Sequence, residues 1–385
     1  MKTKNKNSDK NKYRICSAAV FILCILLLIF LEANKYKYSY ITGILVRSAI
    51  YALVAVSMNL VTGFTGLFSL GQAGFMAIGA YTVGILTIPV AQRPAVYYMN
   101  GISPVIEKMY MPFWAAIIAG GIFAAFCAAL IGIPVLRLKS DYLAIATLGF
   151  SEIIRAFIAS PQLNKITNGS YGLKNIPAFP NLYTVFGICA VCIALIVLLI
   201  NSSYGRVFKA IREDETAAQA MGINLFKYKE LSFVISSFFT GIGGGLLAMF
   251  MGSIDSKTFQ IALTYDILLI VVLGGIGSVT GSILGAFLIT SGREWLRFFD
   301  EPLTLAGINI PLFRAGFRMV IFSILLMAVV LFYRKGIMGT NEFSWEAVFN
   351  LFKKRNSAGA GSGRSDIQDN HSDDGVKRIL NDREA

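Results

Sequence analysis

Residues 183–200 read YTVFGICAVCIALIVLLI, a run that contains no charged side chain. A helix of this length can cross the roughly 30 Å hydrocarbon core of a bilayer. In lipid the backbone must satisfy its own hydrogen bonds, and the alternating pattern of a membrane barrel is absent from the sequence. The run therefore predicts a transmembrane α-helix.

Similar apolar runs recur along the chain. The expected spans are 15–33, 41–61, 70–90, 112–136, 142–160, 183–200, 231–251, 263–277, 279–291 and 313–333. The runs at 263–277 and 279–291 are short and rich in glycine, so they could be re-entrant instead of full spans. We predict an all-α polytopic membrane protein with about 8–10 transmembrane helices.

Charge and composition divide the chain into three parts. Residues 1–14 form a basic tail, residues 15–336 the transmembrane domain, and residues 337–385 a largely disordered tail that contains the sequence SAGAGSGR. Basic residues favour the cytoplasmic side of a membrane, so both termini are expected to be cytoplasmic. Arg293 and Arg297 fit this arrangement less well, because the span count places them outside.

The overall composition supports a membrane protein. The chain is 55% hydrophobic and 15% charged, whereas a soluble domain has about 25% charged residues. The formal net charge of +13 could indicate nucleic-acid binding or the positive-inside bias of membrane proteins. No basic surface interleaved with aromatic residues is evident, so the second explanation is favoured and no nucleic-acid partner is expected.

The cysteines and the single histidine suggest no chemistry. All five cysteines fall in apolar segments, and the pair Cys189 and Cys192 lies in the middle of an apolar run, where a redox pair would lack water. His371 lies in the polar tail. We therefore expect no catalytic residue, no metal site and no cofactor.

Two glycine triplets share their spacing. Each opens a helix of small residues, and the triplets are Gly63, Gly66 and Gly74, and Gly274, Gly277 and Gly285. Transporters are often built from two related halves whose broken helices meet at the substrate site. Membrane helices also use glycine for close packing, and spacing alone does not separate the two explanations.

Residues 202–224 form a polar segment between two predicted spans. Val207 and Ile211 recur at a helical interval, Lys209 can pair with Glu213, and Gly222 is a natural helix stop. The segment predicts a short cytoplasmic helix that offers one apolar face. Anionic lipid would repel the acidic triplet at 213–215, so a protein partner is favoured over a membrane surface.

Within this segment the sequence resembles a known family. Ala217 and Ala218, followed by Gly222, resemble the E-A-A-x-x-x-G loop of ABC importer permeases, which docks in a cleft of the ATPase subunit. Longer strings are similar to branched-chain amino acid permease subunits of the LivM type, at 59–86, 138–158, 167–177, 205–224, 268–287 and 317–339. The similarity covers about residues 40–340, although Thr216 stands where the family has its acidic residue. It implies that this helix couples to an ATPase through Gly205, Arg206, Lys209, Arg212, Glu215, Ala217, Ala218, Met221 and Gly222.

The resemblance implies the permease subunit of an importer for leucine, isoleucine and valine in the bacterial inner membrane. The chain has no G-x-x-x-x-G-K-[ST] loop, so separate subunits would hydrolyse ATP. The implied partners are two ABC ATPases, a related second permease, an extracytoplasmic substrate-binding protein and membrane lipid. The chain itself is not expected to be an enzyme.

Polar groups inside spans are costly in lipid and usually face a cavity. The candidate pathway residues are Asn59, Ser69, Gln72, Thr147, Ser151 and Glu152. A zwitterionic substrate needs a site for its carboxylate, and the helix N-termini that follow the glycine breaks, before residues 70 and 279, could supply one. Glu152 can also pair with Arg155 at a helix end among lipid headgroups.

Two other transport functions stay open. Permeases for urea or short amides have the same architecture, although the string DYLAIATLGF at 141–150 favours the amino acid branch. An ion-coupled secondary transporter would need an intramembrane carboxylate, and Glu152 is the one expected from the sequence. The polar segment at 202–224 argues against a transporter that works alone.

Overall fold

The computed structural model describes residues 19, 22–23, 25–34, 37–99, 101–138, 140–296, 304–305, 308–309, 320–324, 327, 331, 336–339 and 342. The chain divides into a unit of Met1–Glu342 and a unit of Phe343–Ala385. The second unit and the basic segment 1–14 lie outside the described residues. The expectations for residues 1–14 and 343–385 therefore stay predictions, whereas the first residues of the predicted C-terminal tail belong to the first unit, where Ile337 and Met338 donate to the carbonyls of Leu273 and Gly274.

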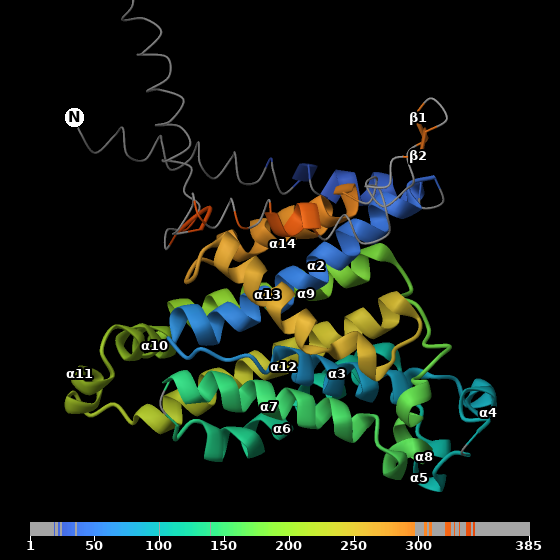
Figure 1. Cartoon of the computed structure of the whole chain (residues 1–385), viewed down its shortest axis with the longest axis horizontal. Coiled ribbons are helices and arrows are strands. Elements are labelled where there is room, and N and C mark those ends of the chain that lie inside the picture. The colour runs from blue at the N-terminus through green and yellow to red at the C-terminus, as the bar shows by residue number, and fades with distance from the viewer. Residues whose placement is uncertain are drawn as a thin grey trace, which may run out of the picture. The chain divides into compact units, whose positions relative to one another are not determined.

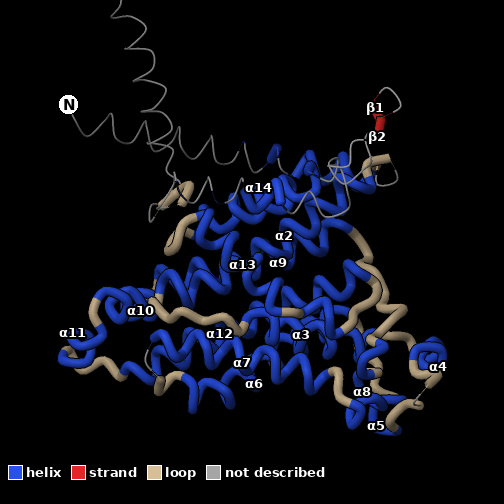
Figure 2. The backbone as a smooth tube through the Cα atoms, in the orientation of Figure 1, coloured by secondary structure: helices blue, strands red, loops and turns tan. Residues whose placement is uncertain are grey.

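The described part of the chain is helical. Its α-helices are α2 (Ser39–Asn59), α3 (Gln72–Thr87), α4 (Arg93–Val96), α5 (Pro104–Glu107), α6 (Phe113–Val135), α7 (Ser140–Ile158), α8 (Asn164–Thr167), α9 (Leu182–Asn201), α10 (Ser203–Glu213), α11 (Glu215–Ala220), α12 (Leu225–Met251), α13 (Ile261–Gly274) and α14 (Val279–Trp295). The two-residue strands β1 (Thr304–Leu305) and β2 (Ile308–Asn309) pair antiparallel. Figure 2 shows helices joined by short loops. The predicted all-α class is confirmed.

Four described helices, or six if each of two bent helix pairs counts as one span, are long and apolar enough to cross a membrane. The four are α6, α9, α12 and α2 with its continuation to Phe64. α6 and α9 agree with the predicted spans 112–136 and 183–200 to within one residue. α13 and α14, with 14 and 17 residues, are shorter than α2, α6, α7, α9 and α12, as the sequence indicated. The predicted spans 15–33 and 313–333 are described only in part.

The helices α2 and α12 form the centre of the bundle. In each, 78% of the most apolar stretch is buried, against 39% in α6 and 28% in α9, which lie at the periphery. α12 packs on α3 and α6, and α2 packs on α14. α3 and α12 approach so closely that a Cβ atom on Gly79 would overlap the carbonyl of Gly241. Small residues thus let the backbones touch, which is typical of helix packing in lipid.

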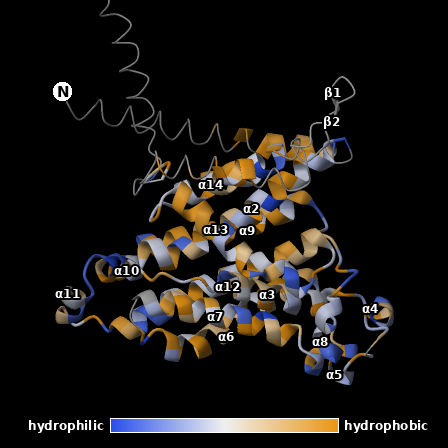
Figure 3. Ribbon diagram, viewed as in Figure 1, coloured by the Kyte–Doolittle hydropathy of each residue, from blue (hydrophilic) through white to orange (hydrophobic). Residues whose placement is uncertain are grey.

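The two ends of the bundle differ in their elements. Figure 1 shows α10 and α11 at one end and the short helices α4, α5 and α8 at the other. Hydrophilic residues colour α10 and the region of α5 in Figure 3, whereas the long helices between them are largely hydrophobic. At the α4 end the buried Arg93 donates hydrogen bonds to backbone carbonyls that include Ile88 and Glu107, and these bonds hold the loop together.

Two breaks interrupt the helices, and they lie side by side. A π-helix (Leu60–Phe64) ends α2 and leads into the first break, residues 65–71, where Gly66 has φ +78°. The second break, residues 275–278, separates α13 from α14, and both of its glycines have positive φ. A Cβ atom on Gly63 would lie 2.5 Å from the backbone nitrogen of Gly277. The glycine triplets therefore lie at breaks and also permit close packing, whereas the origin of the two breaks in related halves stays a prediction.

Candidate coupling and translocation sites

The predicted single cytoplasmic helix at 205–224 is two helices. Asp214 has an extended backbone between α10 and α11, and its Oδ1 atom accepts hydrogen bonds from the backbone nitrogens of Thr216 at 2.8 Å and Ala217 at 3.1 Å. Asp214 is therefore the N-cap of α11, a role that aspartate performs well. The predicted pairing of Lys209 with Glu213 is also wrong, because Glu213 pairs with Arg212.

The two helices bury one face against their own chain. Phe208 and Ile211 of α10 are fully buried, and Ala218 of α11 is only 4% exposed. Ala217 is exposed, and Met221 is 82% exposed. Ala217 and Met221 therefore form the outward surface, whereas Ala218, which the sequence grouped with Ala217 as a docking residue, already has a partner within the chain.

The remaining residues of this segment have defined places. Gly205 is buried where a Cβ atom would overlap the carbonyl of Ile200, so glycine permits α10 to turn against the end of α9. Arg206 is exposed and donates to the Ser203 hydroxyl at 3.0 Å. Gly222 has φ +82°, which glycine adopts without strain, and it lies directly after the C-cap of α11.

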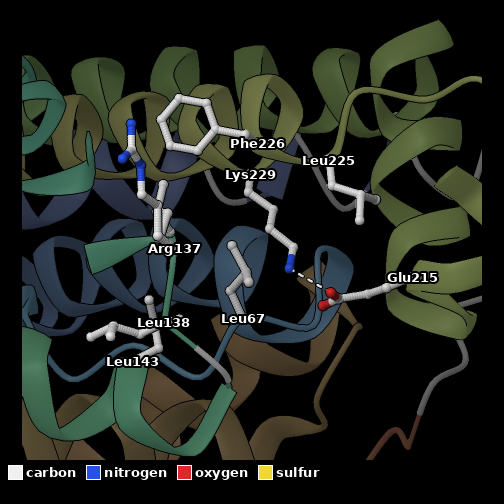
Figure 4. A pocket seen from close by; sticks show the side chains of 9 residues that line it. Leu67, Arg137, Leu138, Leu143, Glu215, Leu225, Phe226 and Lys229 are labelled. Carbon is white, nitrogen blue, oxygen red and sulfur yellow. Dashed lines mark ion pairs between the residues drawn. The ribbon is translucent and has the colours of Figure 1, made fainter. Parts of the chain in front are cut away.

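A groove of about 610 Å³ separates α11 from the α6–α7 connection (Figure 4). Lys229 of α12 and Glu215 of α11 point toward one another across it and form an ion pair of 2.7 Å. Leu67 of the first break and Leu143 of α7 contribute to its apolar lining. The ion pair ties α11 to α12, and the groove places the first break next to the coupling helices.

Hydroxyl and amide groups gather around the N-terminus of α3, directly after the first break. Gln72 is buried, donates to the Ser236 hydroxyl at 3.4 Å and accepts from the Thr240 hydroxyl at 2.6 Å. Thr147 of α7 accepts from the backbone nitrogen of Leu70 at 2.9 Å. These groups are neutral, and so is the Thr264 hydroxyl, which accepts from the Ala73 nitrogen in the first turn of α3 at 3.2 Å.

The other predicted pathway residues of this region lie close by. Ser69 is buried, and its hydroxyl accepts from the backbone nitrogen of Gly71 at 3.5 Å. Within the described part of the chain the buried Ser151 hydroxyl has no hydrogen-bond partner, and the Ser151 backbone lies against Gly74. Glu152 and Arg155 form the expected ion pair at 2.6 Å and are both partly exposed. Buried hydroxyls thus line α7 where it faces α3.

Asn59, the last residue of α2, is fully buried and its side chain contacts the second break. Its Oδ1 atom accepts from the backbone nitrogen of Gly277 at 2.8 Å. Its Nδ2 atom donates to the Ser278 carbonyl at 2.9 Å and to the Ser282 hydroxyl at 2.8 Å. Both polar atoms of the amide are thus engaged in hydrogen bonds that join α2 to the second break and to the start of α14. In this conformation Asn59 is a structural bridge. Both polar atoms of its side chain are already hydrogen-bonded, so neither is free for the predicted pathway role.

A carboxylate does lie at the N-terminus of α14, but it comes from this chain. Glu342 accepts hydrogen bonds from the backbone nitrogens of Val279 at 2.8 Å and Thr280 at 3.1 Å. Such a terminus carries partial positive charge and binds carboxylates readily. Glu342 therefore occupies the helix N-terminus that was predicted from the sequence as a site for the substrate carboxylate. Lys209 and Arg212 share a cavity of about 560 Å³ with this carboxylate.

The sequence interpretation missed Asp266 of α13 and its pairing with Arg293 of α14. Asp266 of α13 and Arg293 of α14 form a doubly hydrogen-bonded ion pair at 2.6 and 2.7 Å. Asp266 lies inside the predicted span 263–277, so the expectation that Glu152 is the one plausible intramembrane carboxylate is wrong. Arg47 pairs with Glu294 at 3.4 Å. Arg293 is thus paired with a carboxylate within the bundle.

A family model covers most of the bundle. The model is described as the branched-chain amino acid transport system permease component, and it matches residues 40–330. This range contains both breaks, the coupling helices α10 and α11, and all the predicted pathway residues. The chain belongs to this family. The family predicted from the sequence is confirmed, and it is a family of multi-pass membrane transport components and not of enzymes.

Individual relatives support the same family. The chain is 34% identical over 297 residues to the high-affinity branched-chain amino acid transport system permease protein LivM of Escherichia coli strain K12, covering 68% of this chain and 65% of the relative. It is 26% identical over 325 residues to a probable branched-chain amino acid transport permease protein LivM of Methanocaldococcus jannaschii, covering 77% of this chain and 93% of the relative. The LivH permease protein of E. coli K12 is 24% identical over 312 residues.

The coverage of these relatives is unequal. The match spans 65% of the E. coli and the Salmonella typhimurium LivM proteins, but 92% of the E. coli LivH protein, with 76% of this chain. No solved structure matches the chain. The similarity to both LivM and LivH proteins shows that two kinds of permease protein share this family with the chain.

Proposed function

We propose that this chain is the membrane-spanning permease subunit of an ABC importer for leucine, isoleucine and valine. The family match over residues 40–330 is the observation that carries this proposal. The helices α10 and α11 support it, because they project from one end of the bundle (Figure 1) and leave Ala217 and Met221 exposed. We place it in the bacterial inner membrane as a transmembrane domain over residues 15–336.

Four partner subunits complete the proposed transporter. The chain has no phosphate-binding loop for ATP, so two ABC ATPase subunits supply the energy. A related second permease forms the other half of the translocation path, and an extracytoplasmic binding protein delivers the amino acid. The relatives named LivM and LivH support a pair of permeases, because both kinds of protein are similar to this chain.

Uptake by cells that depend on this system tests the substrate class. Leucine, isoleucine and valine are expected to compete with one another for uptake, whereas urea and acetamide are not. Dependence of urea uptake on this chain, without dependence of leucine uptake, would establish the alternative amide branch.

The docking surface is tested by adding charge to α11. Ala217→Glu puts bulk and an unpaired charge on the exposed face, a change that typically costs several kcal/mol in a packed interface. We expect normal abundance in the membrane, with loss of ATPase co-purification and of leucine uptake. Gln219→Glu is the matched control, because it adds the same charge to an exposed position on the opposite side of α11. Ala218→Glu is less informative, because Ala218 is buried within the chain.

The proposed orientation places both termini and α10–α11 in the cytoplasm. The basic segment 1–14 and the residues 337–385 are then cytoplasmic tails. Met221→Cys offers an exposed reporter in a background without the native cysteines. An impermeant thiol reagent is expected to label it in inverted vesicles and not in intact cells. Labelling in intact cells would rule out this orientation and the docking role together.

A further inference from the structure

One side chain of α10, that of Arg212, contacts both helix breaks. Arg212, in the last turn of α10, extends back to the bundle, and its Nη1 atom donates a hydrogen bond to the carbonyl of Gly63 at 2.9 Å. Gly63 lies in the π-helix that leads into the first break. Such π-helical turns are frequent at functional sites because they locally distort the helix.

The same side chain touches the second break. A Cβ atom on Gly277 would lie 3.1 Å from the Nη1 atom of Arg212. The aliphatic part of Arg212 packs on Gly66 of the first break, where a Cβ atom would lie 3.0 Å from Cγ and 3.2 Å from Cα. One arginine therefore contacts both breaks at the point where Gly63 and Gly277 meet.

Arginine has the geometry that this position requires. Its guanidinium carries several donors in a fixed plane, whereas a lysine ammonium is a single point charge on a flexible stem. The Nη1 atom of Arg212 donates to the Gly63 carbonyl, while its Nε atom donates to the Glu213 carboxylate at 3.2 Å. Glu213 thus holds the guanidinium in place from the side of α10. A charge-assisted hydrogen bond of this kind is about twice as strong as a neutral one.

We propose that Arg212 is the positioning residue that passes movement of the coupling helices to both helix breaks at once. This inference rests on the proposed function, because it assumes that an ATPase displaces α10 and α11. Phe208 and Ile211 anchor α10 on the bundle, and Arg212 joins that anchored face to the carbonyl of Gly63 and to Gly277. A displacement of α10 therefore moves the two breaks together, because Gly63 and Gly277 are already in contact.

The experiment compares variants in the complete transporter, reconstituted in liposomes with its binding protein. Leucine uptake and ATP hydrolysis are measured on the same preparation, and their ratio is the readout. Arg212→Gln is expected to keep ATPase subunits bound and to hydrolyse ATP, while leucine transported per ATP falls by about tenfold. Arg212→Lys keeps the charge and one donor, so it is expected to recover part of the ratio.

Lys227→Gln is the control, because it removes an exposed positive charge from the first turn of a different helix, α12. Its ratio is expected to match that of the unmodified chain. An unchanged ratio in Arg212→Gln, or an equal fall in Lys227→Gln, would overturn the role of Arg212. If Arg212→Gln does not reach the membrane, the ratio in Arg212→Lys decides the question in the same way. Absence of leucine-stimulated hydrolysis in the unmodified complex would instead reject the proposed function itself.

Discussion

The two helix breaks have the same glycine spacing but different chemistry. At the first break, neutral hydroxyls from other helices of the bundle accept hydrogen bonds from the backbone. Thr147 accepts from Leu70 within the break, and Thr264 accepts from Ala73 at the N-terminus of α3. At the second break, Asn59 bonds to the backbone on both sides of Gly277, and Glu342 covers the N-terminus of α14. Side-chain hydroxyls that a ligand could replace hold the first break. The side-chain amide of Asn59 and the carboxylate of Glu342 hold the second.

This difference predicts different tasks for the two breaks. A zwitterion can compete for neutral hydroxyls, because breaking one such hydrogen bond costs only about 1 kcal/mol. An amide that bridges two backbone groups and a buried hydroxyl is harder to displace, because each unpaired buried group costs about 1–3 kcal/mol. We therefore expect the substrate to meet the first break, while the second serves as a fixed joint, which moves as one unit and keeps its internal hydrogen bonds.

The largest effect is expected where the two breaks touch. Gly63→Ala would place a methyl group on Asn59 Oδ1 and 2.5 Å from the backbone nitrogen of Gly277. Overpacking typically costs about 1–3 kcal/mol, and this overlap lies at the upper end because it involves backbone on one side. We expect the variant to be nearly absent from the membrane on immunoblots. Gly149→Ala is the control, because no atom lies within 4 Å of its new methyl group. Equal abundance of the two variants would show that the breaks separate easily.

A smaller effect is expected at the first break. Thr147→Val keeps the shape of the side chain and removes the hydroxyl that accepts from the Leu70 nitrogen. Loss of this bond is worth about 1 kcal/mol, which corresponds to about fivefold in affinity. We expect a fivefold rise in the KM for leucine at near-normal abundance. Thr82→Val provides the comparison, because the Thr82 hydroxyl bonds only to the carbonyl of Ile78 in its own helix. A KM that rises in neither variant would remove the first break from the pathway.

The smallest effect is expected at the second break. Glu342→Gln keeps the side-chain shape but removes the charge from the N-terminus of α14, an interaction worth about 0.3–1 kcal/mol. A small fall in the thermal stability of the purified complex should follow, with leucine uptake unchanged within about twofold. A tenfold loss of uptake would contradict a fixed joint and would make Glu342 part of the transport cycle.

Hydropathy predicted the long helices well because lipid imposes a simple rule on them. Runs such as 183–200 must be helical wherever they cross the bilayer, so the bounds of α9 follow from composition alone. The break at Asp214 also had a signal in the sequence, since aspartate directly before a run of helix-forming residues is a common N-cap. It was missed because the acidic triplet was interpreted only as charge.

The site was less accessible from the sequence because its contacts are long-range. Asn59 and Gln72 were found as polar residues in apolar spans. Whether such a residue is a structural bridge or lines the pathway depends on its hydrogen bonds, and these join segments that are distant in the sequence. The bond from Arg212 to Gly63 and the position of Glu342 likewise depend on the tertiary fold. Asp266 was visible within a predicted span, and only its partner Arg293 required the structure.

The short helices α13 and α14 have a consequence for membrane insertion. A helix of 14 residues such as α13 rises about 21 Å, which is less than the roughly 30 Å core of a bilayer. Asp266 and Arg293 would each enter lipid as a lone charge if their helices were inserted one at a time, whereas together they neutralise each other. We therefore expect the translocon to release α13 and α14 as a hairpin, after Arg293 has left the ribosome. A nascent chain that ends between the two helices would leave α13 outside the membrane.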